Sequence, residues 1–185
     1  MSLGFPFFML TMTIKLGDWS NNVTTTMSND ETFAFGTLTL PGSQVFAKSD
    51  RSFAFVNIRP FLPGHSLVSP LRVVKRYRDM TADELLDFSI MVQITAAALE
   101  LKYEGTASTI VIQDGEAAGQ TIPHVHAHII PRVKDDLKNP DSIYDELEKP
   151  TNRLWTEEEM AVAANETRPF IERVMDERGI GCFLP

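Results

Sequence analysis

The chain has 185 residues, of which 43% are hydrophobic and 23% are charged, as is ordinary for one globular domain. Its formal net charge of −8 argues against a protein that binds nucleic acid through bulk electrostatic attraction. The single cysteine excludes a disulfide framework and the cysteine-rich zinc modules, and it favours a reducing, intracellular setting. No stretch approaches the roughly 20 apolar residues of a membrane span.

Residues 1–32 are predicted to form a flexible N-terminal extension. The stretch 17–32 is polar and rich in Asn, Thr, Ser and Asp, a composition typical of linkers and disordered tails. The preceding run 4–14 is apolar, but it lacks the positive charge in front of it that marks a signal peptide. We therefore expect one folded domain that begins near Phe33 and covers 33–185.

Short strands and one long helix are expected in the first half of this domain. The strands lie at 45–48, 52–58 and 65–70, between clusters of turn residues. Thr81 and Glu84 form a capping box, in which each side chain satisfies an exposed backbone N–H at the start of a helix. The apolar stripe that follows predicts a packing helix, which we expect Gly105 to end.

The second half is predicted to contain two paired strands and a C-terminal helix. The β-branched stretch 108–113 favours a core strand, and the Asp-Gly pair after it favours a tight turn. The strand that follows this turn would run antiparallel to it. We expect 134–150 to be a mobile loop, and 156–178 to be a helical region that a second capping box opens and Pro169 ends or kinks.

Three of the four histidines occupy alternate positions in one run, as His124, His126 and His128. An alternation of period two is typical of a half-buried strand, and it would place the three imidazoles on one face. The small and aliphatic residues between them would then face the core. Such regular spacing argues against three unrelated core histidines and predicts a functional site on this strand.

Metal binding is one use of three histidines, because neutral imidazoles ligate zinc. Three successive positions on one strand face, however, spread over about 13 Å and do not converge on one ion. His65, the fourth histidine, follows a turn and offers one further ligand. The run itself contains no acidic ligand, so we predict no metal bound by protein side chains.

Nucleophilic attack on phosphorus is the second use, since an unprotonated imidazole, with an ordinary pKa of about 6.5, is a good nucleophile. His126, at the centre, is the candidate attacker, and its neighbours can hold its tautomer or stabilise charge on phosphate oxygens. A basic cluster from Arg72 to Arg78 and the connection around Gly119 suit an anionic substrate. A third use is to bind a nucleotide as a signal without catalysis.

The pattern of residues 124–130 is that of the histidine triad, in which histidines alternate with apolar residues. The surrounding sequence resembles the fragile histidine triad (Fhit) branch of this family, whose members hydrolyse dinucleoside polyphosphates. The segments that carry the resemblance are 53–57, 63–72, 113–121, 141–144 and 157–160. The resemblance implies cleavage of diadenosine triphosphate (Ap3A) to AMP and ADP through a nucleotidyl-histidine intermediate.

The resemblance also implies a role for each candidate residue. His126 would attack the α-phosphorus, and His128 would contact the α-phosphate and the bridging oxygen. The ring and tautomer of the nucleophile would be supported by His124 and His65, and Gln113 would bind the phosphates. The remaining substrate contacts would come from Asn57 at the ribose and from Gly119, Gln120, Thr121 and Ile122 around the phosphate and sugar.

The same resemblance implies the architecture and the partners. The fold would be an α+β, HIT-like antiparallel meander sheet with one long packing helix and a C-terminal helix, and the sheet would continue across a homodimer. Magnesium or manganese would arrive on the polyphosphate, and no cofactor would be tightly bound. The expected location is cytoplasmic, and nuclear as well, with neither nucleic acid nor a membrane as partner.

Two alternatives to this function stay open at the level of sequence. One is a nucleoside phosphoramidase of the same family, which would cleave AMP-lysine. The other is a nucleotide-binding signalling protein with weak catalysis. Tyr144 matches a tyrosine that can be phosphorylated in animal relatives.

Overall fold

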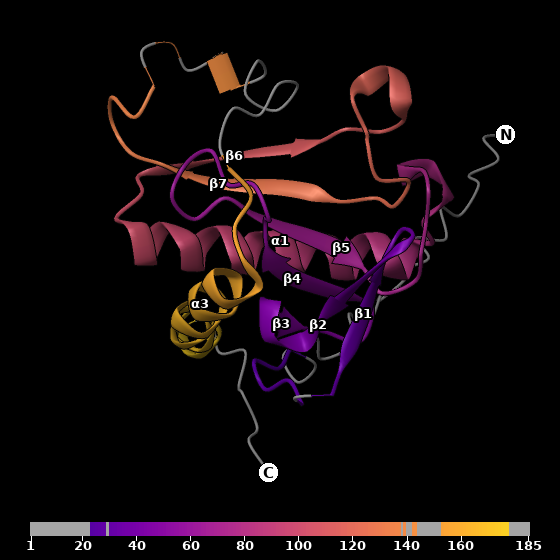
Figure 1. The fold of residues 1–185 in the computed structure, drawn as a ribbon, viewed down its shortest axis with the longest axis horizontal. Helices are drawn as coiled ribbons and strands as arrows, with labels where there is room; N and C mark the ends of the chain where they lie inside the picture. The colour runs from indigo at the N-terminus through magenta and orange to yellow at the C-terminus, as the bar shows by residue number, and fades with distance from the viewer. Residues whose placement is uncertain (1–22, 29, 138, 140–141, 144–152, 178–185) are drawn as a thin grey trace, which may run out of the picture.

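The computed structural model describes residues 23–28, 30–137, 139, 142–143 and 153–177. Five antiparallel strands form the main sheet in the order β3-β4-β5-β7-β6 (Figure 1). They are β3 (Val45–Lys48), β4 (Ser52–Val56), β5 (Ser66–Pro70), β6 (Ala107–Ile112) and β7 (Ala127–Arg132). Two long helices, α1 (Ala82–Tyr103) and α3 (Glu157–Glu177), pack against this sheet and confirm the expected α+β class.

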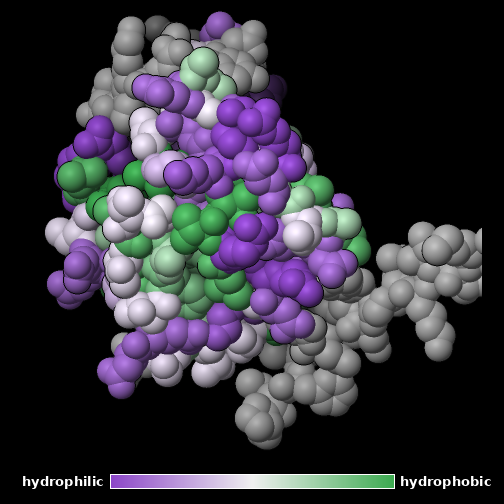
Figure 2. All heavy atoms as spheres, turned by 90° about the vertical axis from the view of Figure 1, so that its right-hand side faces the viewer, coloured by the Kyte–Doolittle hydropathy of each residue, from purple (hydrophilic) through white to green (hydrophobic). Residues whose placement is uncertain are grey.

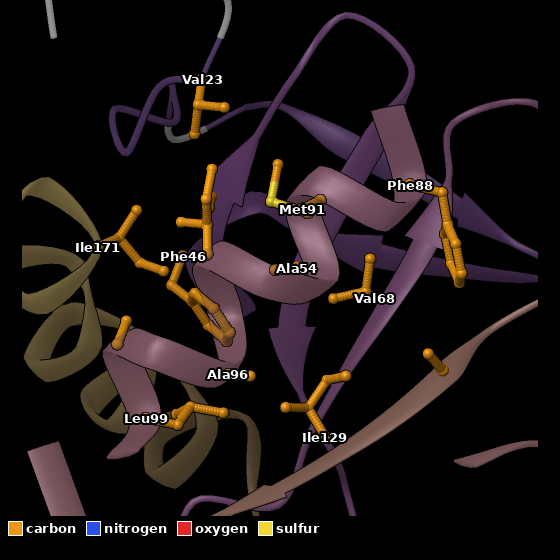
Figure 3. Packing of buried hydrophobic residues seen from close by; sticks show 14 of the residues in the cluster. Val23, Phe46, Ala54, Val68, Phe88, Met91, Ala96, Leu99, Ile129 and Ile171 are labelled. Atoms are coloured by element: carbon orange, nitrogen blue, oxygen red, sulfur yellow. The ribbon is translucent and has the colours of Figure 1, made fainter. Parts of the chain in front are cut away.

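One face of the sheet is buried under α1, because alternate strand residues point toward the helix. Ala54, Val68 and Ile129 come from three neighbouring strands, and Phe88 of α1 belongs to the same cluster (Figure 3). α3 contributes Ile171 from the side of β3. Removing these side chains from water is the main favourable contribution to the stability of the domain.

The other face of the sheet carries a second apolar cluster beneath a two-stranded hairpin. The strands of the hairpin are β1 (Thr32–Phe35) and β2 (Leu38–Pro41), which are connected to β3 through the 3-10 turn η2 (Gly42–Gln44). Phe33 lies 5.0 Å from Phe53, and Phe35 lies 5.0 Å from Phe55, between ring centroids. Leu67 of β5 belongs to this cluster and is paired with His128 of β7, so both side chains point to the same face of the sheet. The hairpin therefore covers the face on which His128 lies.

Both predicted capping boxes are confirmed. The N–H of Glu84 donates to the hydroxyl of Thr81, and the N–H of Thr81 donates to the Glu84 carboxylate. The same exchange joins Thr156 and Glu159 at the start of α3. In the described part of the chain, neither long helix is apolar enough to cross a membrane.

Two details refine the predicted ends of the helices: α1 stops directly before Gly105, as expected, and α3 continues past Pro169, which was expected to end or kink it. Glu104, and not Gly105, adopts the left-handed conformation that closes α1. Pro169 does not end α3, which continues to Glu177. Pro169 has no backbone N–H, so α3 lacks one hydrogen bond at this position. Ile171, two residues further on, is fully buried and holds this part of the helix against the core.

Residues ahead of Phe33 already pack on the domain. The main chain of Thr24 pairs with Lys48 of β3 through hydrogen bonds of 2.8 and 2.9 Å. Thr25 donates to Glu172 of α3, and Val23 is buried in the main core. Among the described residues, the folded part therefore already includes Val23. Residues 1–22 and most of the loop expected at 134–150 lie outside the described residues.

β6 lies at the edge of the sheet, so the prediction of a core strand at 108–113 was wrong. Among the described residues, only β7 pairs with it, from Ala107 opposite Arg132 to Ile112 opposite Ala127. Ile110 remains 48% exposed, and Ile112 37%. β-branched residues favour strands in general, so they do not distinguish an edge strand from a central one.

Candidate active site

The histidine run joins the sheet later than predicted. β7 begins at Ala127, so His128 alone of the three lies within a strand, and the other two precede it. The N–H of Val125 donates to the carbonyl of Val74 at 2.7 Å, so this part of the run is held by a loop. The predicted alternation still holds, since Val125, Ala127 and Ile129 are all buried in the main core.

His126 has one ring nitrogen that is bonded and one that is free. Its Nδ1 lies 2.7 Å from the carbonyl oxygen of His124. Because a carbonyl can only accept, Nδ1 must carry the proton and Nε2 must keep its lone pair. Within the described residues, Nε2 makes no hydrogen bond. Nε2 is therefore the atom that can attack an electrophile.

His124 fixes the tautomer of His126 through its main-chain carbonyl, and its own ring is held by other partners. Its Nε2 lies 3.1 Å from the carbonyl oxygen of Arg72, and the N–H of Gly36 donates to its Nδ1 at 3.1 Å. The ring is fully buried, and both nitrogens have partners. This imidazole is neutral and has no polar atom left for a substrate.

His65 contacts His128, whereas we expected it to support His126. Nε2 of His65 lies 2.9 Å from Nδ1 of His128. The amide nitrogen of Asn57 lies 3.0 Å from Nε2 of His65 and 3.3 Å from its Nδ1. The oxygen of the same amide accepts the N–H of Arg59 at 3.2 Å. These side chains form one continuous network from the loop before β5 to β7.

Burial lowers the pKa of every histidine in this cluster. Loss of hydration disfavours the charged ring and, together with the nearby His126, lowers the pKa of His65 to about 3. Burial is also the main cause that lowers the pKa of His126, His124 and His128. All four rings are therefore neutral at neutral pH, and the lone pair on Nε2 of His126 is available. The described residues contain no group of three or more His, Cys, Asp or Glu placed to hold a metal ion.

The connection between β6 and β7 brings Gln113 beside the run. A Cβ on Gly119, whose φ is +86°, would lie 2.5 Å from the amide nitrogen of Gln113. Glycine is therefore required here for the amide to rest on the connection. The side chain of Gln120 accepts the N–H of Gly115 at 2.7 Å and donates to the carbonyl of Lys75 at 3.2 Å. The Gln120 side chain thus shapes the connection, and its main-chain N–H also donates to the carbonyl of Gly115 at 3.2 Å.

The other predicted substrate residues lie on the same connection. Thr121 is exposed. Ile122 packs against the second apolar cluster, beneath the β1–β2 hairpin. Tyr144 is outside the described residues.

Three residues that support the site were not predicted. Phe35 packs edge-on against His126, with ring centroids 5.2 Å apart. Gly36 donates its N–H to His124. Ser69 is fully buried and donates its hydroxyl to the carbonyl of Val125 at 2.7 Å, which fixes the chain between the two histidines that precede β7. The alternating aromatic residues Phe33 and Phe35, directly before Gly36, could have indicated a strand that packs on the site. The hydrogen bond from Ser69 to Val125 depends on the order of the strands in the sheet, which the sequence does not reveal.

A family model for the HIT domain matches residues 41–135, a range that contains all four histidines. The chain belongs to the histidine triad (HIT) family. The bis(5'-adenosyl)-triphosphatase of Dictyostelium discoideum is 44% identical over 138 residues, which are 75% of this chain and 92% of that protein. The asymmetrical bis(5'-nucleosyl)-tetraphosphatase of Schizosaccharomyces pombe is 50% identical over 113 residues, which are 61% of this chain and 62% of that protein. These relatives agree with the Fhit branch that the motifs indicated.

A solved structure shows the same HIT fold. The diadenosine triphosphate hydrolase of Plasmodium falciparum, in complex with cyclomarin A, superimposes with a TM-score of 0.66 at 31% identity. The superposition covers 81% of this chain and 90% of the Plasmodium chain. The architecture predicted from the HIT resemblance is therefore confirmed for the single chain.

Proposed function

We propose that this HIT protein hydrolyses dinucleoside polyphosphates and cleaves Ap3A to AMP and ADP. The observation that carries the proposal is the free Nε2 on the neutral ring of His126, a largely buried side chain whose orientation is fixed by the main chain of His124. Relatives named as a triphosphatase and a tetraphosphatase support the substrate class.

The first step forms a bond between Nε2 of His126 and the α-phosphorus while the bond from that phosphorus to the bridging oxygen breaks. ADP leaves with the electron pair of the broken bond. The phosphorylated imidazole is now cationic, and the carbonyl of His124, 2.7 Å from Nδ1, stabilises its remaining proton. Water then attacks the same phosphorus, the N–P bond breaks, AMP departs, and the proton of the water is released.

The network behind His128 supplies a donor for this chemistry. In one arrangement Asn57 donates to Nδ1 of His65, and Nε2 of His65 donates to Nδ1 of His128. The 3.0 Å contact between the Asn57 amide nitrogen and Nε2 of His65 is then not a hydrogen bond. Nε2 of His128 must then carry its proton and can donate to the α-phosphate or to the bridging oxygen. His65 and Asn57 are therefore positioning residues for His128, and Asn57 retains one amide hydrogen for the ribose.

The remaining contacts suit a polyphosphate. We assign the Gln113 amide to the phosphate oxygens, with Gly119, Gln120, Thr121 and Ile122 lining the phosphate and sugar site. Magnesium or manganese would enter as part of the substrate, bound to its phosphates. We also propose a cytoplasmic or nuclear location, since one cysteine suits a reducing compartment.

Product chromatography tests the proposed function against its alternatives. The purified protein is incubated separately with Ap3A, with diadenosine tetraphosphate (Ap4A) and with AMP-lysine. The proposal predicts AMP and ADP from Ap3A, at a rate well above that of AMP-lysine cleavage. Cleavage of AMP-lysine alone would assign the chain to the phosphoramidases, and binding of Ap3A without turnover would favour a signalling role.

The pH dependence of the reaction should reflect the lowered pKa of His126. Protonation of Nε2 removes the nucleophile, and kcat/KM reports ionisations of the free enzyme. The internal phosphates of Ap3A do not titrate in this range, so kcat/KM should stay level from about pH 8 and fall only below the ordinary histidine value of about 6.5. An acid limb centred at or above that value would contradict the assignment of a buried, neutral nucleophile.

We propose a homodimer in which β6 pairs with its copy in a second chain. Within the described part of the chain, β6 is an edge strand whose outer backbone groups pair with no other strand, and its exposed Ile110 and Ile112 are apolar. Light scattering should give a dimer for the wild type and a monomer for Ile110→Glu. Val162→Glu, which alters an equally exposed apolar residue on α3, is the matched control and should remain dimeric. A monomeric wild type, or a dimeric Ile110→Glu protein, would exclude this interface.

A further inference from the structure

A cavity of about 640 Å³ opens at the end of the histidine run where the β6–β7 connection lies. Pro123, directly before His124, lines it together with Thr121 of the connection. Lys75 and Arg76, just ahead of the 3-10 turn η3 (Tyr77–Asp79), also line it. This volume is within the range of small-molecule sites in proteins.

The strand register places this cavity and the Asn57–His65 network on opposite sides of the nucleophile. Val68 of β5 lies opposite Ala127, and Ser66 lies opposite Ile129. His65 therefore lies beyond the position of His128 along β7, whereas Pro123 lies before that of His126. A dinucleotide whose first ribose meets Asn57 and whose α-phosphorus meets His126 can therefore continue in the same direction and place its other nucleotide in the cavity.

The charges around the cavity favour a phosphate chain. Arg76 is bound to Asp114 by hydrogen bonds of 2.9 and 3.2 Å, so its charge is largely compensated. Lys75 is exposed and forms no ion pair with any described residue, while its carbonyl accepts a bond from Gln120 that fixes its main chain. Glu116 also lines the cavity and opposes a bare anion. A polyphosphate that carries a divalent cation matches both side chains, because its phosphates attract Lys75 and its cation attracts Glu116.

Figure 2 shows the side of the molecule on which η3 and the β6–β7 connection lie, and hydrophilic side chains gather there around an apolar centre.

We propose that the cavity binds the leaving nucleotide of a dinucleoside polyphosphate, and that Lys75 contacts the phosphates beyond the bond that breaks. This inference rests on the proposed hydrolase function. It makes Lys75 a specificity residue for the leaving group, since the covalent step itself does not require this side chain.

The test compares substrates that share the AMP half and differ in the leaving group. Ap3A and Ap4A carry phosphates into the cavity, whereas the p-nitrophenyl ester of AMP does not. Lys75→Ala should lower kcat/KM for both dinucleotides by about 5–10-fold at low salt, as expected for one charge-assisted contact. The ester should change by less than about 2-fold. The matched control is Lys134→Ala, because Lys134 is exposed and follows the opposite end of β7.

Two outcomes would overturn the inference. One is an equal loss for the ester and the dinucleotides, which would make Lys75 important for the AMP half or for the fold. The other is an unchanged kcat/KM for all substrates. Failure of the proposed function is a separate result, because the wild type would then release no AMP from Ap3A or Ap4A.

Discussion

Replacing His126 with Ala should lower kcat for Ap3A by at least about 10⁴-fold, because the reaction loses the nucleophile and not an auxiliary contact. The neighbouring groups do not substitute for it. Both ring nitrogens of His124 have protein partners, and His128 is bonded to His65 through Nδ1. The comparison is made by steady-state kinetics on protein whose folded state is verified by circular dichroism.

His65→Gln is the matched control for this prediction. His65 acts through His128, so its loss should lower kcat by about 10–100-fold, well short of the loss for His126→Ala. A His126→Ala protein within about 100-fold of the wild type would exclude His126 as the nucleophile. A His65→Gln protein as inactive as His126→Ala would show that the network behind His128 takes a direct part in the chemistry.

Gly64→Ala should lower the free energy of unfolding by about 3 kcal/mol or more, from left-handed backbone strain and from steric overlap. Gly64 has a φ of +81°, and a Cβ there would lie 2.6 Å from the ring of Tyr103 and 2.8 Å from Cγ of Pro131. Neither neighbour can move freely, since Tyr103 packs against the core and Pro131 belongs to β7. Urea denaturation followed by circular dichroism measures the change.

Gly105→Ala is the control for this substitution. Gly105 does not have a positive φ, and its Cβ would meet its nearest neighbour at 3.3 Å. We expect a loss below about 1 kcal/mol there. Equal losses at the two positions would contradict the close packing of the loop that carries His65 onto α1.

Local patterns were enough to predict much of the architecture. The capping boxes at Thr81 and Thr156 located the starts of both helices, because they involve residues only three positions apart. The alternation in the histidine run predicted that Val125 and Ala127 face the core. The turn pair and the connection after it predicted that β6 and β7 are antiparallel neighbours, although the connection, from Ile112 to Ala127, is longer than a tight turn.

Features that depend on distant residues could not be predicted. The edge position of β6 follows from the order of the whole sheet. The tautomer of His124 is set by Gly36 and Arg72, which lie 88 and 52 positions away. The late start of β7 follows from the bond between Val125 and Val74. The pairing of Thr24 with β3 could not be predicted from composition, because polar residues are common both in linkers and in short segments that pair at the edge of a sheet.

The covalent intermediate on His126 tests the central claim most directly. The wild type is mixed with Ap3A and quenched within milliseconds in base, where a phosphorus–imidazole bond survives, and the digested protein is analysed by mass spectrometry. We predict one adenylyl group on the peptide that contains His126, and none in the His126→Ala protein. A wild type that turns over Ap3A without any adenylylated peptide, or with the adenylyl group on another residue, would contradict the mechanism.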